Sequence, residues 1–173
     1  VNSNLQNYEC ILITGTSLAA EPSRSAVLYA LKLAKEKKIP VIMDIDYRPY
    51  TWESEDKAKE IYNLAGDYCS GIIGNDDEFA ILSGNYDDGL GYAKKISRNC
   101  DLVIYKMGEK GSITFANNEE IERGIFPVKS LKPTGAGDAF IGSLIGAILK
   151  NYDLQKAIEI GSAAAAIVVT KVG

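Results

Sequence analysis

Short apolar runs alternate along this chain with longer segments whose apolar residues recur every three or four positions. Such an order is typical of βαβ units, in which helices connect parallel strands. The sequence therefore predicts an α/β domain with a largely parallel sheet flanked by helices. We expect strands at residues 10–14, 40–45, 71–73 and 102–106, with helices at 22–37, 56–64, 76–82 and 89–97.

The second part of the chain is expected to hold a hairpin and two helices. Two segments of strand character, 112–116 and 121–126, flank Asn117-Asn118, a pair of residues that favours a tight turn. Apolar residues then follow helical spacing through 139–150 and 154–170. Because the chain has no internal repeat, low-complexity stretch or linker, we interpret residues 1–173 as a single domain.

Composition excludes several classes of function. The net charge of −4 gives no general attraction to nucleic acid or to an anionic membrane. The absence of histidine excludes a Ser-His-Asp triad, a Cys-His dyad and any histidine-ligated metal site, so a general base must be a carboxylate, lysine, tyrosine or cysteine. Cys10, Cys69 and Cys100 are widely spaced, and we interpret them as reduced thiols of a cytoplasmic protein.

Neither end of the chain reads as a natural terminus. Residues 1–9 are polar and lack the basic start and apolar core of a secretory signal, and the sequence has no initiator methionine. No apolar run approaches the ~20 residues that a membrane-spanning helix requires. We therefore expect this chain to be part of a longer protein that lies in the cytoplasm.

The segment before residue 139 combines small residues with one carboxylate. Gly135, Ala136 and Gly137 would form the first turn of the following helix or the loop that enters it. Backbone N–H groups there lack intrahelical acceptors and favour an anion such as phosphate. Asp138 would lie beside that anion and could take a proton from an attacking hydroxyl. The alternative is an ordinary glycine-rich turn, in which Asp138 only adds favourable charge at a helix N-terminus.

Polar residues also follow the second predicted strand, where ligands bind in open α/β sheets. The spacing of Asp44 and Asp46 predicts that they share one face, and Arg48 follows in a loop stiffened by Pro49. An arginine in this place can hold a carboxylate or a phosphate through two hydrogen bonds. The alternative is a structural ion pair between Arg48 and one of these aspartates, with Trp52 as a packing residue.

The third and fourth predicted strands also end in polar or glycine-rich segments. Asn75 and Glu78 supply oxygen atoms of the kind that Mg²⁺ prefers, but their spacing equally fits a helix N-cap with its capping-box partner. Both interpretations can hold. Lys106 precedes a G-x-x-G turn at Gly108 and Gly111, which can lie against a nucleotide or simply connect two strands.

Together these motifs resemble the signature of the ribokinase (PfkB) family of carbohydrate kinases. The resemblance depends on T-G-A-G-D-A-F at 134–140, D-x-D-x-R-x-x-x-W at 44–52, N-x-x-E at 75–78 and G-x-x-G at 108–111. Many members have Asn where this chain has Asp46. The resemblance implies a ribokinase-like fold with a Rossmann-like, largely parallel sheet. A dinucleotide-binding domain is excluded, because no G-x-G-x-x-G follows the first strand.

The resemblance also implies a reaction, in which the γ-phosphoryl group of ATP passes to a sugar hydroxyl with Mg²⁺ as a cofactor. Asp138 would be the base at the substrate, and Gly135, Ala136 and Gly137 would form the anion hole. Arg48 would bind the substrate, and Asn75 and Glu78 would hold Mg²⁺ through water. The nucleotide-binding residues that the resemblance implies are Asn75, Glu78, Lys106, Gly108, Gly111, Thr134 and Gly137.

Further strings resemble one branch of the family, which acts in inositol catabolism. They are T-G-T-S-L at 14–18, E-P-S-R at 21–24, D-I-D-Y-R-P-Y-T-W at 44–52 and L-K-P-T-G-A-G-D at 131–138. Members of this branch phosphorylate 5-dehydro-2-deoxygluconate at its 6-hydroxyl. The alternatives are another sugar or sugar-acid kinase (2-keto-3-deoxygluconate kinase, fructokinase or ribokinase) and a non-catalytic nucleotide-binding fragment. The expected partners are a small sugar acid and ATP, with a homodimer for the full-length enzyme.

Members of the family are longer than this chain. The resemblance covers their carboxy-terminal, nucleotide-binding part, without the amino-terminal half and its lid, so we expect the chain alone to bind ATP weakly and to catalyse nothing. Many members also carry Asp-Thr before the glycine motif, where the Asp helps to hold an activating monovalent cation. Lys132-Pro133 occupies that place here. Because a lysine repels a cation, we hypothesise that the enzyme needs no potassium.

Overall fold

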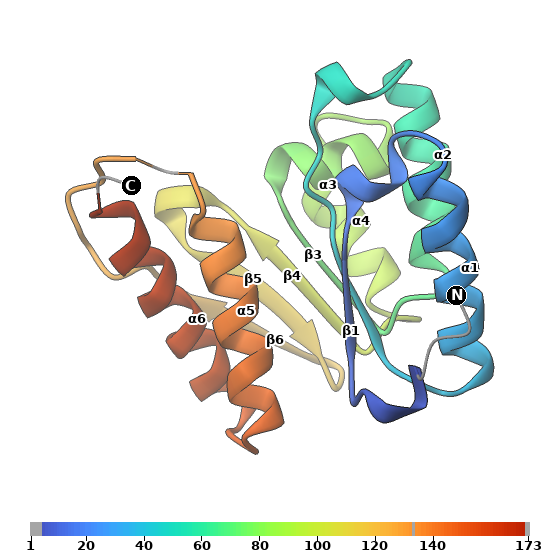
Figure 1. Ribbon diagram of the computed structural model, residues 1–173. Helices are drawn as coiled ribbons and strands as arrows, with labels where there is room; N and C mark the ends of the chain where they lie inside the picture. The colour runs from blue at the N-terminus through green and yellow to red at the C-terminus, as the bar shows by residue number, and fades with distance from the viewer. Residues whose placement is uncertain (1–4, 133, 172–173) are drawn as a thin grey trace. The chain divides into compact units, whose positions relative to one another are not determined.

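The computed structural model describes residues 5–132 and 134–171, and its contacts divide into two compact units. The first unit comprises residues 1–107 and 113–120, and the second comprises 108–112 and 121–173. In the first unit the chain alternates between strands and helices (Figure 1), with β1 Ile11–Thr14, α1 Ser23–Glu36, β2 Val41–Asp44, α2 Glu55–Gly66, β3 Gly71–Asn75, α3 Asp76–Ser83, α4 Gly89–Ile96 and β4 Leu102–Lys106. The elements that follow are β5 Ser112–Ala116, β6 Glu119–Arg123, α5 Ala136–Leu149 and α6 Leu154–Val169.

The strands form one six-stranded sheet in the order β1-β2-β3-β4-β5-β6. The first four are parallel, and their register aligns Thr14 with Asp44, Asp44 with Ile73, and Asn75 with Lys106. Because crossovers between parallel strands are right-handed and the strand order never reverses, the connecting helices α1–α4 lie on one face. The carboxyl ends of these strands therefore lie together at one edge of the sheet.

A continuous core fills the space between that face and the helices. Its members come from every layer of the first unit, and they include Met43, Ile72 and Val103 from the strands with Leu31, Ala58, Phe79 and Ala93 from the helices. Since side chains alternate along a strand, Ile42, Ile73 and Ile104 point to the opposite face. They are buried too, which explains why the strands read as unbroken apolar runs.

The structure confirms the strand and helix pattern that the sequence predicts in the first unit, within one or two residues at most ends. The hairpin differs. Its second strand begins at Glu119 rather than at residue 121, because Asn117 and Asn118 both adopt positive φ angles (53° and 62°) and reverse the chain in two residues. The helix predicted at 139–150 also starts earlier, since α5 already begins at Ala136, whereas the start predicted at residue 154 is confirmed by α6.

In the second unit, helices α5 and α6 pack against each other at a point where no side chain fits. A Cβ atom added to Gly161 of α6 would lie 2.9 Å from the carbonyl oxygen of Phe140 in α5. Gly142 of α5, by contrast, is exposed and has open space around its Cα. Among the residues that the structure describes, no helix has the length and apolar character needed to cross a membrane.

This contrast makes two glycine substitutions opposite in effect. We expect Gly161→Leu to lower the free energy of unfolding by about 1–3 kcal/mol, because the side chain would push α5 away from α6. We expect Gly142→Leu to raise it by about 0.5 kcal/mol, because leucine favours a helix more than glycine does. Urea unfolding of both variants checks this, and equal effects would contradict the close approach at Gly161.

Candidate functional site

In the loop after β2, the Asp46 carboxylate holds the side chain of Arg48. Asp46 has a φ of +40°, a strained conformation for a residue with a side chain. Its carboxylate accepts a hydrogen bond from Thr16 Oγ1 at 3.1 Å and pairs with Arg48 Nη2 at 2.6 Å. The structural ion pair considered from the sequence is therefore present. Arg48 is still half exposed, and its guanidinium carries five N–H donors, so it can also bind an anion.

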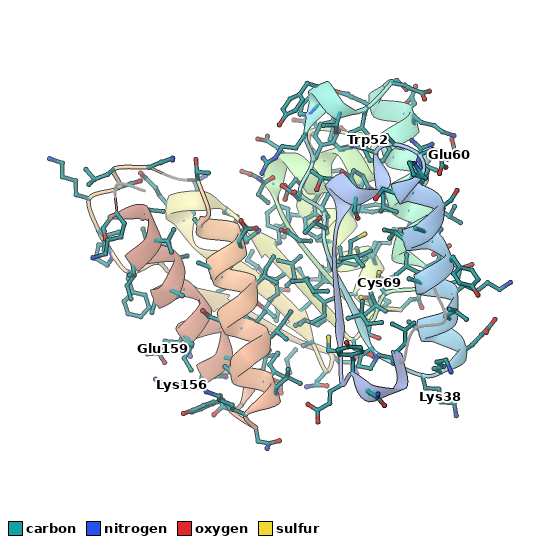
Figure 2. All side chains as sticks on the ribbon, viewed as in Figure 1. Lys38, Trp52, Glu60, Cys69, Lys156 and Glu159 are labelled. Carbon is teal, nitrogen blue, oxygen red and sulfur yellow. The ribbon has the colours of Figure 1, made fainter. Side chains whose placement is uncertain are left out.

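Trp52, labelled in Figure 2, anchors the far end of this loop. The residue is 8% exposed, and its indole packs on Tyr62, with ring centroids 5.0 Å apart. The Arg24 guanidinium lies 5.8 Å from the Trp52 ring and donates hydrogen bonds to the carbonyl groups of Leu18 and Ala19. Trp52 is thus a packing residue, as the structural interpretation expects, and it holds the loop that bears Arg48 against α2.

Glu78 connects the loop after β2 to the start of α3. Asn75 caps this helix by accepting the Glu78 N–H at 2.8 Å, and Glu78 Oε2 accepts the Asn75 N–H at 2.7 Å. The capping box considered from the sequence is therefore confirmed. The other carboxylate oxygen, Oε1, accepts the backbone N–H of Tyr47 at 3.2 Å. One buried carboxylate thus holds two separate loops.

Burial raises the pKa of the Glu78 carboxyl above its ordinary value. The N–H groups of Asn75 and Tyr47 and the ammonium of Lys106 act in the opposite direction, but burial is the larger effect. The nearby Asp46 carboxylate raises the pKa further. Glu78 is therefore a carboxylate in a place that disfavours its negative charge, which is a common feature of functional sites.

Lys106, the last residue of β4, pairs with Asp44, the last residue of β2. The distance between Lys106 Nζ and Asp44 Oδ1 is 3.7 Å, and the Asp44 side chain is 9% exposed. The sequence places Lys106 at a nucleotide site by resemblance, but it does not predict its partner.

In the second unit, Gly108 and Gly111 both have positive φ angles (56° and 90°). A Cβ at Gly111 would collide with the Arg123 carbonyl, whereas Gly108 has open space.

The first turn of α5 is open to an anion. Gly135 precedes the helix with a φ of +86°, and Ala136, Gly137 and Asp138 are its first three residues. Backbone N–H groups in these positions lack acceptors within the helix. The Asp138 side chain is exposed beside them. This is the helix-start geometry that the sequence predicts for phosphate binding.

The segment that leads into α5 is tied to the end of α6. The backbone N–H groups of Leu131 and Lys132 both donate to the carbonyl of Val169, at 2.8 and 3.2 Å. Thr134 is exposed directly before Gly135. Pro133, which belongs to the Lys132-Pro133 pair singled out in the sequence, lies outside the described residues.

Sequence reasoning missed three contacts of this site. They are the Thr16 hydrogen bond to Asp46, the Glu78 hydrogen bond to Tyr47, and the Asp44–Lys106 pair. The predicted alternation of Asp44 and Asp46 could not reveal them, because β2 ends at Asp44 and the positive φ of Asp46 interrupts the pattern. Within residues 5–132 and 134–171, no three Cys, Asp or Glu side chains form a group that could hold a metal ion directly.

Comparison with known proteins identifies the class of this chain. The profile of the pfkB family of carbohydrate kinases matches residues 1–173, and the chain belongs to that family. A 5-dehydro-2-deoxygluconokinase of Geobacillus thermodenitrificans is 37% identical over 171 residues, and that of Bacillus subtilis is 35% identical over 172. Each alignment covers 96% of this chain but only 51% or 52% of the relative. The chain thus spans about half the length of these relatives.

Solved structures confirm the ribokinase-like α/β fold. The aminoimidazole riboside kinase of Salmonella enterica, crystallised with aminoimidazole riboside and an ATP analog, has a TM-score of 0.85 and 27% identity, over 96% of this chain and 58% of that one. A Vibrio cholerae fructokinase with fructose, ADP and a potassium ion has a TM-score of 0.85 and 24% identity, over 95% and 55%.

The raised pKa of Glu78 predicts how stability depends on pH. The folded state binds the proton more tightly than the unfolded state, so stability from this proton is present below pH 4.5 and is lost as pH rises through the folded pKa. We expect the free energy of unfolding of the wild type, minus that of Glu78→Gln, to fall as pH rises from 4 towards 7. Urea titrations at several pH values measure this, and a difference that grows with pH would contradict it.

Proposed function

We propose that the complete kinase transfers the γ-phosphoryl group of ATP to a sugar acid, and that the product is the 6-phosphate of 5-dehydro-2-deoxy-D-gluconate. The observation that carries this proposal is the exposed Asp138 in the first turn of α5, next to N–H groups that favour an anion. The names of the relatives at 35–38% identity support the choice of substrate.

Asp138 acts as the general base. Its carboxylate takes the proton of the attacking primary hydroxyl while the new bond forms between that oxygen and the γ-phosphorus, and the bond to the leaving oxygen of ADP breaks. The N–H groups of Gly135, Ala136 and Gly137 stabilise negative charge on the transferred group, in the manner of an oxyanion hole. This backbone already has the conformation of a helix start, since Gly135 adopts its left-handed conformation directly before α5.

Arg48 binds the carboxylate of the sugar acid. Its pair with Asp46 fixes the direction of the side chain before substrate arrives and leaves donors for a second acceptor. Selection for an acid over a neutral sugar would follow, because a neutral sugar leaves this arginine without a new charged partner.

Asn75 and Glu78 fit a magnesium site of the kind in which water lies between metal and protein. Their oxygen atoms already accept backbone N–H groups, and each has a further lone pair that a metal-bound water can use. When bound, Mg²⁺ would neutralise charge on the phosphates. Lys106, Gly108, Gly111 and Thr134 contribute to nucleotide binding, through the ammonium group and through backbone that a nucleotide can approach closely.

The base role of Asp138 is tested by Asp138→Asn in the complete kinase. We expect kcat to fall by about 10²–10⁴-fold, because asparagine cannot accept the proton, while the affinity for ATP stays within about twofold of the wild type. Steady-state rates and calorimetric titration with Mg-ATP measure the two effects. Asp101→Asn, at an exposed position just before β4, is the matched control. Turnover that survives Asp138→Asn would exclude the base role.

The carboxylate contact of Arg48 predicts a change in specificity. We expect Arg48→Met to raise KM for the sugar acid by about tenfold or more, because a charged hydrogen-bonded pair is lost, and to leave KM for ATP nearly unchanged. KM is measured for the acid and for its neutral reduced analogue, in the wild type and in Arg48→Met. An equal rise in KM for both acceptors would show that Arg48 does not bind the carboxylate.

Lys132, which is exposed before α5, predicts that no monovalent cation is needed for activity. We expect equal rates, within about twofold, in sodium, potassium and tetramethylammonium buffers, because the lysine charge disfavours a second cation beside it. Strong activation by potassium would contradict the hypothesis. Activation by potassium in Lys132→Asp, together with a wild type that does not respond to potassium, would support the hypothesis further.

A further inference from the structure

Asp44 and Lys106 belong to strands that are not neighbours in the sheet. Strand β3 lies between β2 and β4, and its register aligns Ile73 with both Asp44 and Ile104, and Asn75 with Lys106. Side chains at aligned positions point to the same face. Asp44 and Lys106 therefore extend over the end of β3 from opposite sides, and they meet there.

The pair has one buried and one accessible member. The side chain of Asp44 is 9% exposed and that of Lys106 is 21% exposed. A buried carboxylate is costly unless an opposite charge lies close to it. The distance of 3.7 Å from Asp44 Oδ1 to Lys106 Nζ is within the range of an ion pair but longer than a hydrogen bond. Asp44 attracts the ammonium group without taking one of its N–H donors at this distance.

We propose that Asp44 is a positioning residue for nucleotide binding, whose carboxylate holds the Lys106 ammonium over the carboxyl end of β3 so that its donors meet the nucleotide phosphates. The inference rests on the proposed function, which places Lys106 at the nucleotide. A lysine side chain has four rotatable bonds, and ordering it costs free energy on binding. The attraction of Asp44 orders the Lys106 side chain already in the free protein, so ATP meets an ammonium group that is in place before binding.

A purely structural ion pair is the competing interpretation, and the two differ in one measurable way. If Asp44 acts through Lys106, its removal weakens ATP binding only while Lys106 is present. If Asp44 only supports the fold, its removal has the same effect with or without Lys106, and it affects both substrates. A double-mutant cycle on ATP affinity separates these cases.

The cycle uses Asp44→Asn, Lys106→Met and the double variant of the complete kinase, with Mg-ATP binding measured by calorimetry in the absence of any sugar. We expect each single variant to bind Mg-ATP about tenfold more weakly and the double variant to bind no more weakly than Lys106→Met. Additive losses, or an unchanged affinity in Asp44→Asn, would overturn the role of Asp44. Asp44→Ser replaces Asp44→Asn if that variant does not fold.

The controls separate this inference from the proposed function. Glu120→Gln breaks an exposed pair with Lys94 in the same unit and is expected to leave ATP affinity unchanged. If Lys106→Met binds ATP normally, the assignment of Lys106 to the nucleotide site is wrong, and the role of Asp44 is wrong with it. If Lys106→Met binds weakly while Asp44→Asn binds normally, the assignment of Lys106 holds and only the inference about Asp44 fails.

Discussion

The two hydrogen bonds that the Glu78 carboxylate accepts are the interaction on which the arrangement of the first unit depends. One oxygen holds the N–H of Asn75 at the start of α3, and the other holds the N–H of Tyr47 in the loop after β2. The loop with Arg48 and the helix start with Asn75 are therefore set relative to each other by a single buried side chain. The cost of burying this carboxylate is visible in its raised pKa.

At the same edge of the sheet, other carboxylates also hold residues of separate segments. Asp46 keeps a strained backbone that Thr16 and Arg48 support through its carboxylate, and Asp44 holds Lys106 across β3. The last residues of β2 and β4, Asp44 and Lys106, pair with each other, and the last residue of β3, Asn75, caps α3. These candidate site residues are therefore oriented by their partners. In the second unit, taken by itself, Gly135 and the first turn of α5 present a set of backbone N–H groups that favour an anion.

Much of this could be predicted from the sequence because the signals are local. Apolar runs locate the strands, Asn75 marks a helix start with a side chain that does accept a backbone N–H group, and Asn117-Asn118 marks the turn. The contacts between Glu78 and Tyr47 and between Asp44 and Lys106 join residues 31 and 62 positions apart. Their partners depend on strand order and register, which no local pattern contains.

We propose that this chain forms the phosphoryl-transfer part of a sugar-acid kinase. The most direct measurement is the structure of the product that the complete kinase forms from Mg-ATP and 5-dehydro-2-deoxygluconate, determined by ³¹P and ¹³C NMR. We expect one phosphomonoester, with phosphorus coupled to C6 and with one ADP released for each ester formed. A product phosphorylated at another carbon, or hydrolysis of ATP without an ester, would contradict it.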